Sequence, residues 1–392
     1  MLNRAERPGG FGSPSEKSDM DFIPVSTPSL SEADAHAVAS CVADGWISSE
    51  GPQVPEFEEM FAHAVGVPHA IAVSNGTAAI DLALESIGIE PGDEVILPSF
   101  TIVSCLNHVL RSGAKPVFVD SSPETWNMDV DQVKAATTSK TKAIIVVHVY
   151  GLPADIDRIA EFAESRGIAV IEDSAEAHGQ HLEGKPLGSF GTLSTFSFYS
   201  NKLITTGEGG MVLTADSQLA EKIRALRNLS FEPGRRFIHH DIGWNYRMTA
   251  MQAALGISQL SRLDKLLAYK QAVGQVYQAG LSDVSFLTIP RPDYRGSANV
   301  YWVFGVVLDR RHPMDAIGAM DELRKRGIGT RPFFYPLHQQ PVLAKYGWQE
   351  QPPLPVSEWL GEKGFYLPNG ANLTDDQLNY IIESVHEVVG GA

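Results

Sequence analysis

Short runs of β-branched and aromatic residues recur along the first half of the chain and limit what it can fold into. They lie at residues 95–97, 116–120, 143–148, 169–172 and 193–198. Helical patterns, such as the one at residues 156–166, separate these runs. Strands that are apolar throughout and that alternate with helices are typical of a parallel sheet covered on both faces. The sequence therefore predicts an α/β fold with a mostly parallel sheet flanked by helices.

The length of the chain predicts more than one domain, because 392 residues exceed the size of a single ordinary core. We expect a flexible N-terminal tail at residues 1–19, which are polar and rich in glycine, proline and serine. A large domain at 20–262 and a smaller C-terminal α/β domain at 263–392 would follow. A long amphipathic helix at 248–267 would lead out of the large domain. The small domain would contain a strand at 300–308 and helices at 313–326 and 375–389.

Composition excludes several classes of function. The formal net charge is -16, which argues against binding to nucleic acid or to a membrane surface. Bound anions must then be held by local positive groups, such as the basic residues at 324–331. No apolar stretch of about 18 residues is present. The only cysteines, Cys41 and Cys105, are too few for a disulfide scaffold and lack zinc spacing, so we expect the reducing cytoplasm and no metal.

One lysine stands among apolar and hydroxyl residues, directly before a glycine-rich turn. Lys202 belongs to the run SFYSNKLITTGEGG at residues 197–210. Partial burial lowers the pKa of a lysine amine toward neutrality, and the unprotonated amine can form a Schiff base with a carbonyl compound. A lysine that extends from a strand end to solvent would have the same surroundings in sequence. Two further segments bear on this choice.

The run at residues 169–172 leads into an acid pair, Glu172 and Asp173. Open α/β sheets bind ligands at the carboxyl ends of their strands, so Asp173 is a candidate for a functional site. Enzymes that use pyridoxal phosphate pair an aspartate with the pyridine nitrogen of this cofactor. Because Asp173 and Ser174 also suit the N-terminal cap of a helix, that structural role is the alternative.

A strand, a polar turn and an alanine-rich helix follow one another at residues 70–84. Small residues at such a turn let backbone amides and the helix N-terminus face a phosphate, so Gly76 and Thr77 are the expected contacts. The spacing of the chain's glycines matches neither the dinucleotide fingerprint nor the P-loop. A phosphate turn, an aspartate and a lysine in this chain order are the arrangement of fold-type I pyridoxal phosphate enzymes.

Six motifs extend this arrangement along the chain. They are DGWISS at 44–49, SNGT at 74–77, PSFT at 98–101, EDSAEAHG at 172–179, the Lys202 segment, and GWNYRMTAMQAA at 243–254. In these motifs, and from about residue 23 to the C-terminus, the chain resembles the DegT-type (StrS-like) family of pyridoxal phosphate-dependent nucleotide-sugar aminotransferases. The resemblance implies a fold-type I α/β architecture and pyridoxal 5'-phosphate as cofactor. It also implies that glutamate donates an amino group, through the cofactor, to a nucleotide-linked keto sugar.

The resemblance implies individual roles for the residues that bind the cofactor. Lys202 would hold it covalently and then move the proton during the reaction. Asp173 would pair with the pyridinium nitrogen. The phosphate would be bound by Gly76, Thr77 and Ser197.

The resemblance also places residues around the substrate and at a subunit boundary. Glu176, which stands where many members carry glutamine, and His178 would line the pocket near the cofactor ring. Asn245 would reach the cofactor phosphate of the neighbouring subunit in a homodimer with shared sites, unless it only caps the helix that follows. Arg247 would contact the partner's substrate. Ile102 stands where many members place an aromatic residue that stacks on the ring, so a different side chain is expected to cover that face.

Two other functions fit parts of this pattern. A dehydratase of the same fold typically carries histidine in place of the reactive lysine, and Lys202 argues against it. A non-catalytic sensor that binds the cofactor would usually carry a nucleic-acid-binding module, and the N-terminal tail is too short for one. Sugar contacts come from loops in this family, so the nucleotide, the sugar and the aminated carbon stay open.

Overall fold

A computed structural model describes residues 22–232 and 234–390, and the expected tail at 1–19 therefore lies outside the described residues. The strands at the centre are β1 (His69–Val73), β2 (Glu94–Pro98), β3 (Lys115–Val119), β4 (Thr141–Val147), β5 (Ala169–Asp173), β8 (Leu193–Ser197) and β9 (Gly210–Thr214). Within the described residues they form one sheet in the order β1-β9-β8-β5-β4-β2-β3. Only β9 runs antiparallel to its neighbours, and the remaining pairs are parallel. The prediction of a mostly parallel sheet is confirmed.

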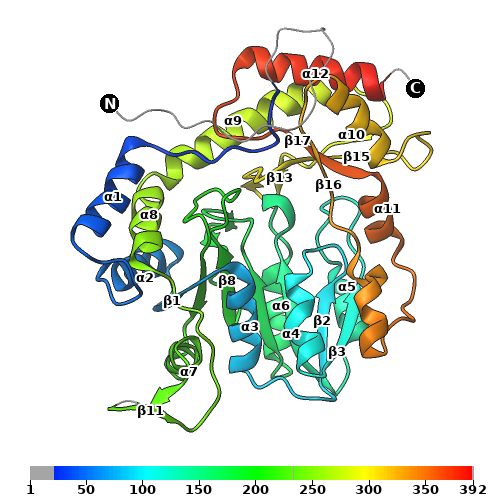
Figure 1. Ribbon diagram of the computed structural model, residues 1–392. Helices are drawn as coiled ribbons and strands as arrows, with labels where there is room; N and C mark the ends of the chain where they lie inside the picture. Colours follow the sequence, from blue (N-terminus) through cyan, green and yellow to red (C-terminus); the bar gives the residue numbers. More distant parts are fainter. Residues whose placement is uncertain (1–21, 233, 391–392) are drawn as a thin grey trace.

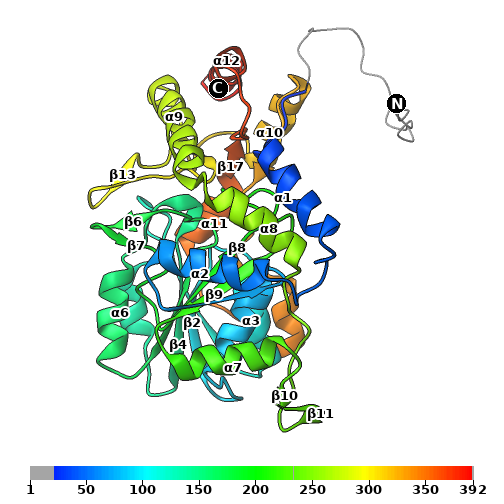
Figure 2. The same cartoon turned by 90° about the vertical axis from the view of Figure 1, so that its left-hand side faces the viewer.

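Helices cover both faces of this sheet (Figures 1 and 2). They are α2 (Gln53–Val65), α3 (Gly76–Ser86), α4 (Ser104–Arg111), α5 (Val130–Ala136), α6 (Ile156–Glu164), α7 (Ser217–Arg227) and α8 (Ala250–Leu260). On one face, α3, α4 and α7 pack on side chains such as Ile145, while Ile144 points to the opposite face and to α6. Burial on both sides explains why the strands are apolar at every position.

A second, smaller sheet lies at the upper end of the molecule in Figure 1. It has the order β12-β15-β17-β16, formed by β12 (Leu287–Thr288), β15 (Phe304–Leu308), β17 (Gly364–Leu367) and β16 (Arg331–Pro332). Packed on it are α9 (Leu263–Leu281), α10 (Ala316–Lys325) and α12 (Asp375–Val389). Ile23 joins this second core and pairs with Ile328. The division into domains at 20–262 and 263–392 stays a proposal, and the chain before α1 (Glu32–Ala43) contributes to both regions.

The remaining elements are short or peripheral. Hairpins in the described residues pair β6 (His181–Leu182) with β7 (Lys185–Pro186), β10 (Phe231–Glu232) with β11 (Arg235–His239), and β13 (Asp293–Tyr294) with β14 (Ser297–Ala298). The helix α11 (Pro355–Lys363) lies between β16 and β17 in the chain. Among the described residues, none of the helices combines the length and the apolar character that crossing a membrane requires.

The long helix that the sequence predicts at 248–267 is interrupted. α8 ends before Ser261 and α9 begins at Leu263, because Arg262 between them has a non-helical φ of -123°. The Arg262 guanidinium forms an ion pair with Asp34 of α1 at 2.7 Å. This break depends on a contact with a helix more than 200 residues earlier in the chain.

A buried carboxylate joins the end of β3 to α11. Asp120 is 4% exposed and accepts hydrogen bonds from the backbone amides of Val356 and Ser357, at 2.9 and 2.7 Å, and from the Ser357 hydroxyl at 2.7 Å. We expect Asp120→Ala to lower the free energy of unfolding by about 2–3 kcal/mol, because it leaves these donors unpaired in the interior. Urea unfolding measures this loss. Asp129→Ala removes the more exposed cap of α5 and should cost about 1 kcal/mol or less; equal losses would contradict the proposed role of Asp120.

Candidate active site

A cavity of about 620 Å³ opens at the carboxyl ends of the central strands. Its wall contains most of the residues that the sequence predicts for a site: Gly76, Thr77, Asp173, Glu176, Ser197 and Lys202. They come together because parallel strands end at the same edge of a sheet. A hollow of similar volume, about 600 Å³, lies over α2 near Arg224 and contains none of these residues.

Lys202 follows β8 and points into the cavity, with its side chain 11% exposed. Its Nζ lies 3.7 Å from Oε1 of Glu176 and 3.8 Å from the centroid of the Trp302 ring. Burial lowers the pKa of the amine below its ordinary value, although the carboxylates of Glu176 and Asp173 oppose this shift. The amine therefore loses its proton more readily than a surface lysine, as a nucleophile requires.

Asp173 lies at the carboxyl end of β5 and is 3% exposed. Its carboxylate accepts the backbone N–H of Ala175 at 3.1 Å, and the Thr195 hydroxyl and the Cys105 thiol lie 3.4 and 3.5 Å from its oxygens. Burial raises the pKa of this carboxyl. In the described chain no helix begins between β5 and α7, so the alternative that Asp173 caps a helix is wrong.

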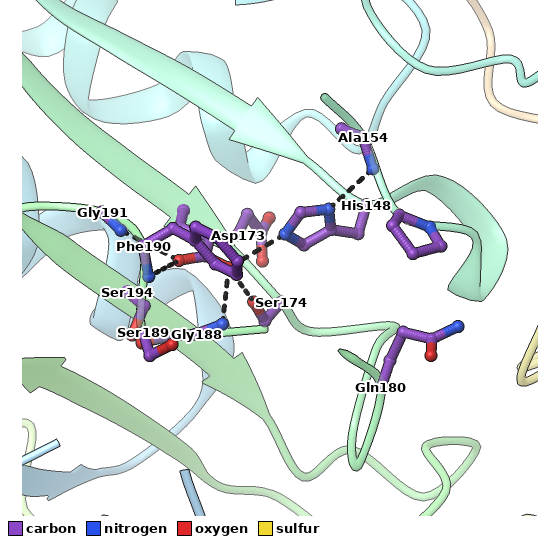
Figure 3. A network of polar contacts seen from close by, with 12 residues as sticks. His148, Ala154, Asp173, Ser174, Gln180, Gly188, Ser189, Phe190, Gly191 and Ser194 are labelled. Atoms are coloured by element: carbon purple, nitrogen blue, oxygen red, sulfur yellow. Dashed lines mark hydrogen bonds and ion pairs between the residues drawn. The ribbon is translucent and has the colours of Figure 1, made fainter. Parts of the chain in front are cut away.

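The neighbouring acid, Glu172, is fully buried in a network that holds the end of β5. Figure 3 shows the surroundings of this network, with His148, Gly188 and Phe190 among the labelled residues. Its oxygens accept hydrogen bonds from His148 Nε2 at 3.0 Å and from the backbone amides of Gly188, Phe190 and Gly191. Burial alone would raise the pKa of Glu172, but these hydrogen bonds and His148 lower it. His148 Nδ1 accepts the N–H of Ala154, and the backbone N–H of His148 donates to the carbonyl of Asp173 at 3.2 Å. The network thus fixes the backbone on which Asp173 stands.

The N-terminus of α3 faces the cavity through Gly76 and Thr77, with Asn75 as its side-chain cap. A Cβ at Gly76 would lie 2.7 Å from Cβ of Ser197, so only glycine lets the two segments approach this closely. The Thr77 hydroxyl bonds the Ser104 hydroxyl at 2.8 Å. Free amides at a helix N-terminus, flanked by hydroxyl groups, form a cradle suited to a phosphate. An amine, a carboxylate and this cradle around one cavity fit the carbonyl, the ring nitrogen and the phosphate of pyridoxal 5'-phosphate.

His178 does not line the cavity. It is 2% exposed and packs against Phe61, Phe196 and Phe198. Burial among these rings lowers its pKa to about 3, which keeps the imidazole neutral. The expectation that His178 lines the pocket differs from the structure, because Phe196 lines the cavity while the His178 ring packs against Phe196 and does not line it.

The segment at 244–247 flanks the cavity but directs only Tyr246 into it. Its backbone continues the edge of the sheet, because Ser74 N–H donates to the carbonyl of Tyr246. Asn245 is exposed, and Arg247 donates to the side-chain oxygen of Asn228 at 2.6 Å. Thr249 is the N-cap of α8, so the alternative that Asn245 caps this helix is wrong.

Residues on or next to the second sheet also line the cavity. They are Trp302, Arg331, Phe334 and Tyr366. Arg331 belongs to the basic segment at 324–331, which the sequence marks as a supply of positive charge. No sequence pattern around the aromatic residues predicts that they line the cavity, because their position there depends on how the two sheets pack together.

Comparison with known proteins agrees with this geometry. The profile of the DegT/DnrJ/EryC1/StrS aminotransferase family matches residues 28–386. A Caulobacter vibrioides protein named GDP-perosamine synthase is 41% identical, covering 95% of this chain and 100% of that protein. The GDP-perosamine synthase of Escherichia coli O157:H7 is 39% identical, covering 94% and 99%.

Solved structures share the fold. The aminotransferase TlmJ from Streptoalloteichus hindustanus is 32% identical with a TM-score of 0.88, covering 94% of this chain and 99% of that one. Helicobacter pylori PseC, an aminotransferase involved in the biosynthesis of pseudoaminic acid, is 26% identical with a TM-score of 0.89, covering 95% and 100%. The fold-type I architecture is confirmed. This chain belongs to the DegT/DnrJ/EryC1/StrS aminotransferase family and is a pyridoxal phosphate-dependent sugar aminotransferase.

Proposed function

We propose that this aminotransferase moves an amino group from glutamate to GDP-4-keto-6-deoxymannose and forms GDP-perosamine. The observation that supports the chemistry is that Lys202, Asp173 and the α3 N-terminus meet in one cavity. The choice of sugar rests on relatives named GDP-perosamine synthase, which match the chain over nearly its whole length. Arg331 and the aromatic residues in the same wall offer charge and stacking surface to a nucleotide sugar.

Each residue has a defined task in this proposal. The cofactor, when bound, supplies an electron sink for the carbon that loses its proton. Lys202 holds the cofactor and moves that proton, and the Asp173 carboxylate keeps the ring nitrogen protonated. Gly76, Thr77 and Ser197 hold the phosphate.

Glu176 is the acid beside the Lys202 amine. Its Oε2 accepts the N–H of Tyr150 at 2.8 Å, and its Oε1 lies 3.7 Å from Lys202 Nζ. Burial raises the pKa of Glu176 to about 7, although Lys202 opposes the shift. We assign it to the pocket at the cofactor ring, where a carboxyl with this pKa can hold or release a proton near neutral pH.

A panel of nucleotide-linked 4-keto sugars, assayed with glutamate, tests the proposed reaction. We expect glutamate to bleach the visible absorbance of the bound cofactor and the GDP-linked 6-deoxymannose derivative to restore it. The same keto sugar should give the highest kcat/KM, with the aminated product identified by mass spectrometry. A clear preference for a dTDP- or UDP-linked keto sugar would overturn the choice of substrate, and other amino donors in place of glutamate test the donor.

We also propose a homodimer whose active sites are shared. Asn245 and Arg247 belong to a family motif but do not line the cavity of their own chain. Nearby, the hairpin of β10 and β11 projects away from the body of the molecule (Figures 1 and 2), and Ile238 and Ile242 on or beside it are 44% and 79% exposed. This exposed apolar hairpin lies next to motif residues that have no role in their own cavity, and such a surface suits contact with a second copy of the chain. In this arrangement Asn245 reaches the partner's cofactor phosphate and Arg247 its substrate.

Mixing two inactive variants tests the shared site. One chain carries Lys202→Ala, and the other carries Asn245→Ala together with Arg247→Ala. In a mixed dimer, one site then holds both lesions and the other holds none, so random exchange should restore roughly a quarter of wild-type activity. Mixing Lys202→Ala with Asp173→Asn is the matched control and should restore nothing, because both residues line the same site. Absence of recovery in the first mixture, after subunit exchange is demonstrated by mass spectrometry, would mean that each site is built from one chain.

The compartment we propose is the cytoplasm. Cys41 and Cys105 are both buried free thiols, which suits a reducing environment. Expression of the tagged protein followed by fractionation tests this assignment.

A further inference from the structure

The indole of Trp302 meets the Lys202 segment at two points. Lys202 Nζ lies 3.8 Å from the centroid of the ring, and Trp302 Nε1 donates to the carbonyl of Asn201 at 2.8 Å. Trp302 itself is 6% exposed. The face of an indole ring attracts a cation. One side chain thus contacts both the amine of Lys202 and the backbone directly before this residue.

The backbone that leads to Trp302 is held in a strained conformation. Tyr301 has a φ of 48°, a left-handed value that is costly for an aromatic residue. Its N–H donates to Asn299 at 2.7 Å and its carbonyl accepts from Asn369 at 2.8 Å. A Cβ at Gly274 of α9 would lie 2.2 Å from the Tyr301 ring, so glycine is required there. The strand predicted at 300–308 accordingly begins late, at Phe304 of β15. The non-extended backbone before it turns Trp302 toward the cavity.

Lys270 of α9 anchors the backbone of Trp302. It is 8% exposed, and its Nζ donates to the carbonyl of Trp302 at 3.1 Å and to the carbonyl of Asn369. Burial lowers the pKa of this amine to about 7. Within the described chain its hydrogen-bond partners are carbonyl groups, with no carboxylate in ion-pair contact. Burial of an amine without a carboxylate partner lowers the stability of the folded protein. The hydrogen bond of Lys270 to the Trp302 carbonyl, in turn, fixes the position of Trp302.

We propose that Trp302 is a positioning residue for the Lys202 amine and that Lys270 holds Trp302 in place. The indole face stabilises the protonated nitrogen of Lys202 and limits the rotation of its side chain, while the bond to Asn201 fixes the backbone. This inference rests on the proposed role of Lys202 as the amine that binds the cofactor. Lys270 lies on α9, which packs on the second sheet, whereas the Trp302 side chain packs in the core of the central sheet. The hydrogen bond between them therefore couples the position of the second sheet to the reactivity of the amine.

The test is a pH titration of the visible absorbance of the full-length holoenzyme, together with kcat and KM for glutamate. In Trp302→Leu, the midpoint pH should fall by roughly 0.5 to 1, because the ring no longer stabilises the cation. We expect kcat to fall about tenfold or more, with KM for glutamate within about threefold of wild type. Trp302→Phe keeps an aromatic face, so its midpoint pH should lie close to the wild-type value. Glu176 and Asp173, the acidic groups that act on the same nitrogen, stay unchanged in every variant.

Trp359 of α11 offers a matched control. Its indole N–H also donates to a backbone carbonyl, that of Leu308 at 2.9 Å, and the Arg310 guanidinium lies 5.3 Å from its ring. Trp359 does not line the cavity. Trp359→Leu should therefore leave the midpoint and kcat unchanged. The same shift in both leucine variants, or no shift and full kcat in a folded Trp302→Leu protein, overturns the proposal.

A second pair of variants tests the anchor. Lys270→Met should shift the midpoint in the same direction as Trp302→Leu, by a smaller amount. Lys363→Met is its control, because the buried Lys363 amine likewise donates to two carbonyls, those of His312 and Met314 at 3.0 and 2.9 Å, outside the cavity. A Lys270→Met enzyme with the wild-type midpoint and kcat contradicts the anchoring role. If Lys202→Ala retains the pH-dependent visible band, the proposed role of Lys202 fails first, and this inference fails with it.

Discussion

Lys202→Ala is expected to abolish turnover while the protein stays folded. The amine holds the cofactor and moves a proton, and proton transfer alone contributes up to about 10⁴-fold to the rate. We therefore expect kcat to fall by at least about 10⁴-fold, with noncovalent cofactor binding partly retained. Steady-state kinetics and the visible spectrum measure these two effects.

The stability of the same variant separates a chemical role from a structural one. Burial lowers the pKa of the Lys202 amine in the folded protein, so at neutral pH its charged form is disfavoured by folding. Removal of the amine should leave the unfolding temperature of the cofactor-free protein unchanged or higher. Lys265→Ala, at an exposed position of α9, is the control and should keep full activity. Repeated turnover by Lys202→Ala would show that another group carries the chemistry.

Asp173→Asn should keep the shape of the site and lose most of the activity. An amide is nearly isosteric with a carboxyl group, but it carries no charge to keep the ring nitrogen of the cofactor protonated. Loss of one electrostatic group of this kind costs roughly 10²–10³-fold in kcat. Asp321→Asn, an exposed change of the same type on α10, should have no effect. Activity within a few-fold of wild type would leave Asp173 with only a structural role.

The pKa of Asp173 gives this variant a second signature. Burial raises that pKa above 3.8, so the stabilising contribution of the protonated carboxyl is present below the unfolded pKa and is lost as pH rises through the folded value. At neutral pH the buried carboxylate therefore destabilises the cofactor-free protein. Asp173→Asn should raise the unfolding temperature of the cofactor-free form at neutral pH and lower the affinity for the cofactor. A less stable cofactor-free variant would contradict this assignment.

The sequence by itself determined the central sheet and the site residues that lie at its strand ends. Runs such as 143–147 are short, β-branched and apolar at successive positions, which is typical of strands buried on both faces. Asp173 ends such a run, Gly76 begins a helix directly after another, and Lys202 follows a third. The positions of these residues depend on local structure, and parallel topology then brings strand ends to one edge. The residues that carry the proposed chemistry were therefore predictable.

Only the tertiary structure decided the direction of β9, because the run at 210–214 has the same burial whether it lies parallel or antiparallel. The break between α8 and α9 depends on Arg262 meeting a carboxylate of α1. Contrary to the prediction from the sequence, His178 does not line the cavity, because its ring packs between aromatic side chains from α2 and β8.

The upper wall of the cavity was likewise decided by tertiary structure. Arg331 and Tyr366 reach it from the second sheet, and Trp302 reaches it from the segment directly before β15. Their distance from Lys202 depends on how two sheets, folded from separate parts of the chain, pack against each other. Local sequence patterns report which side of an element is buried, but not which distant element covers it.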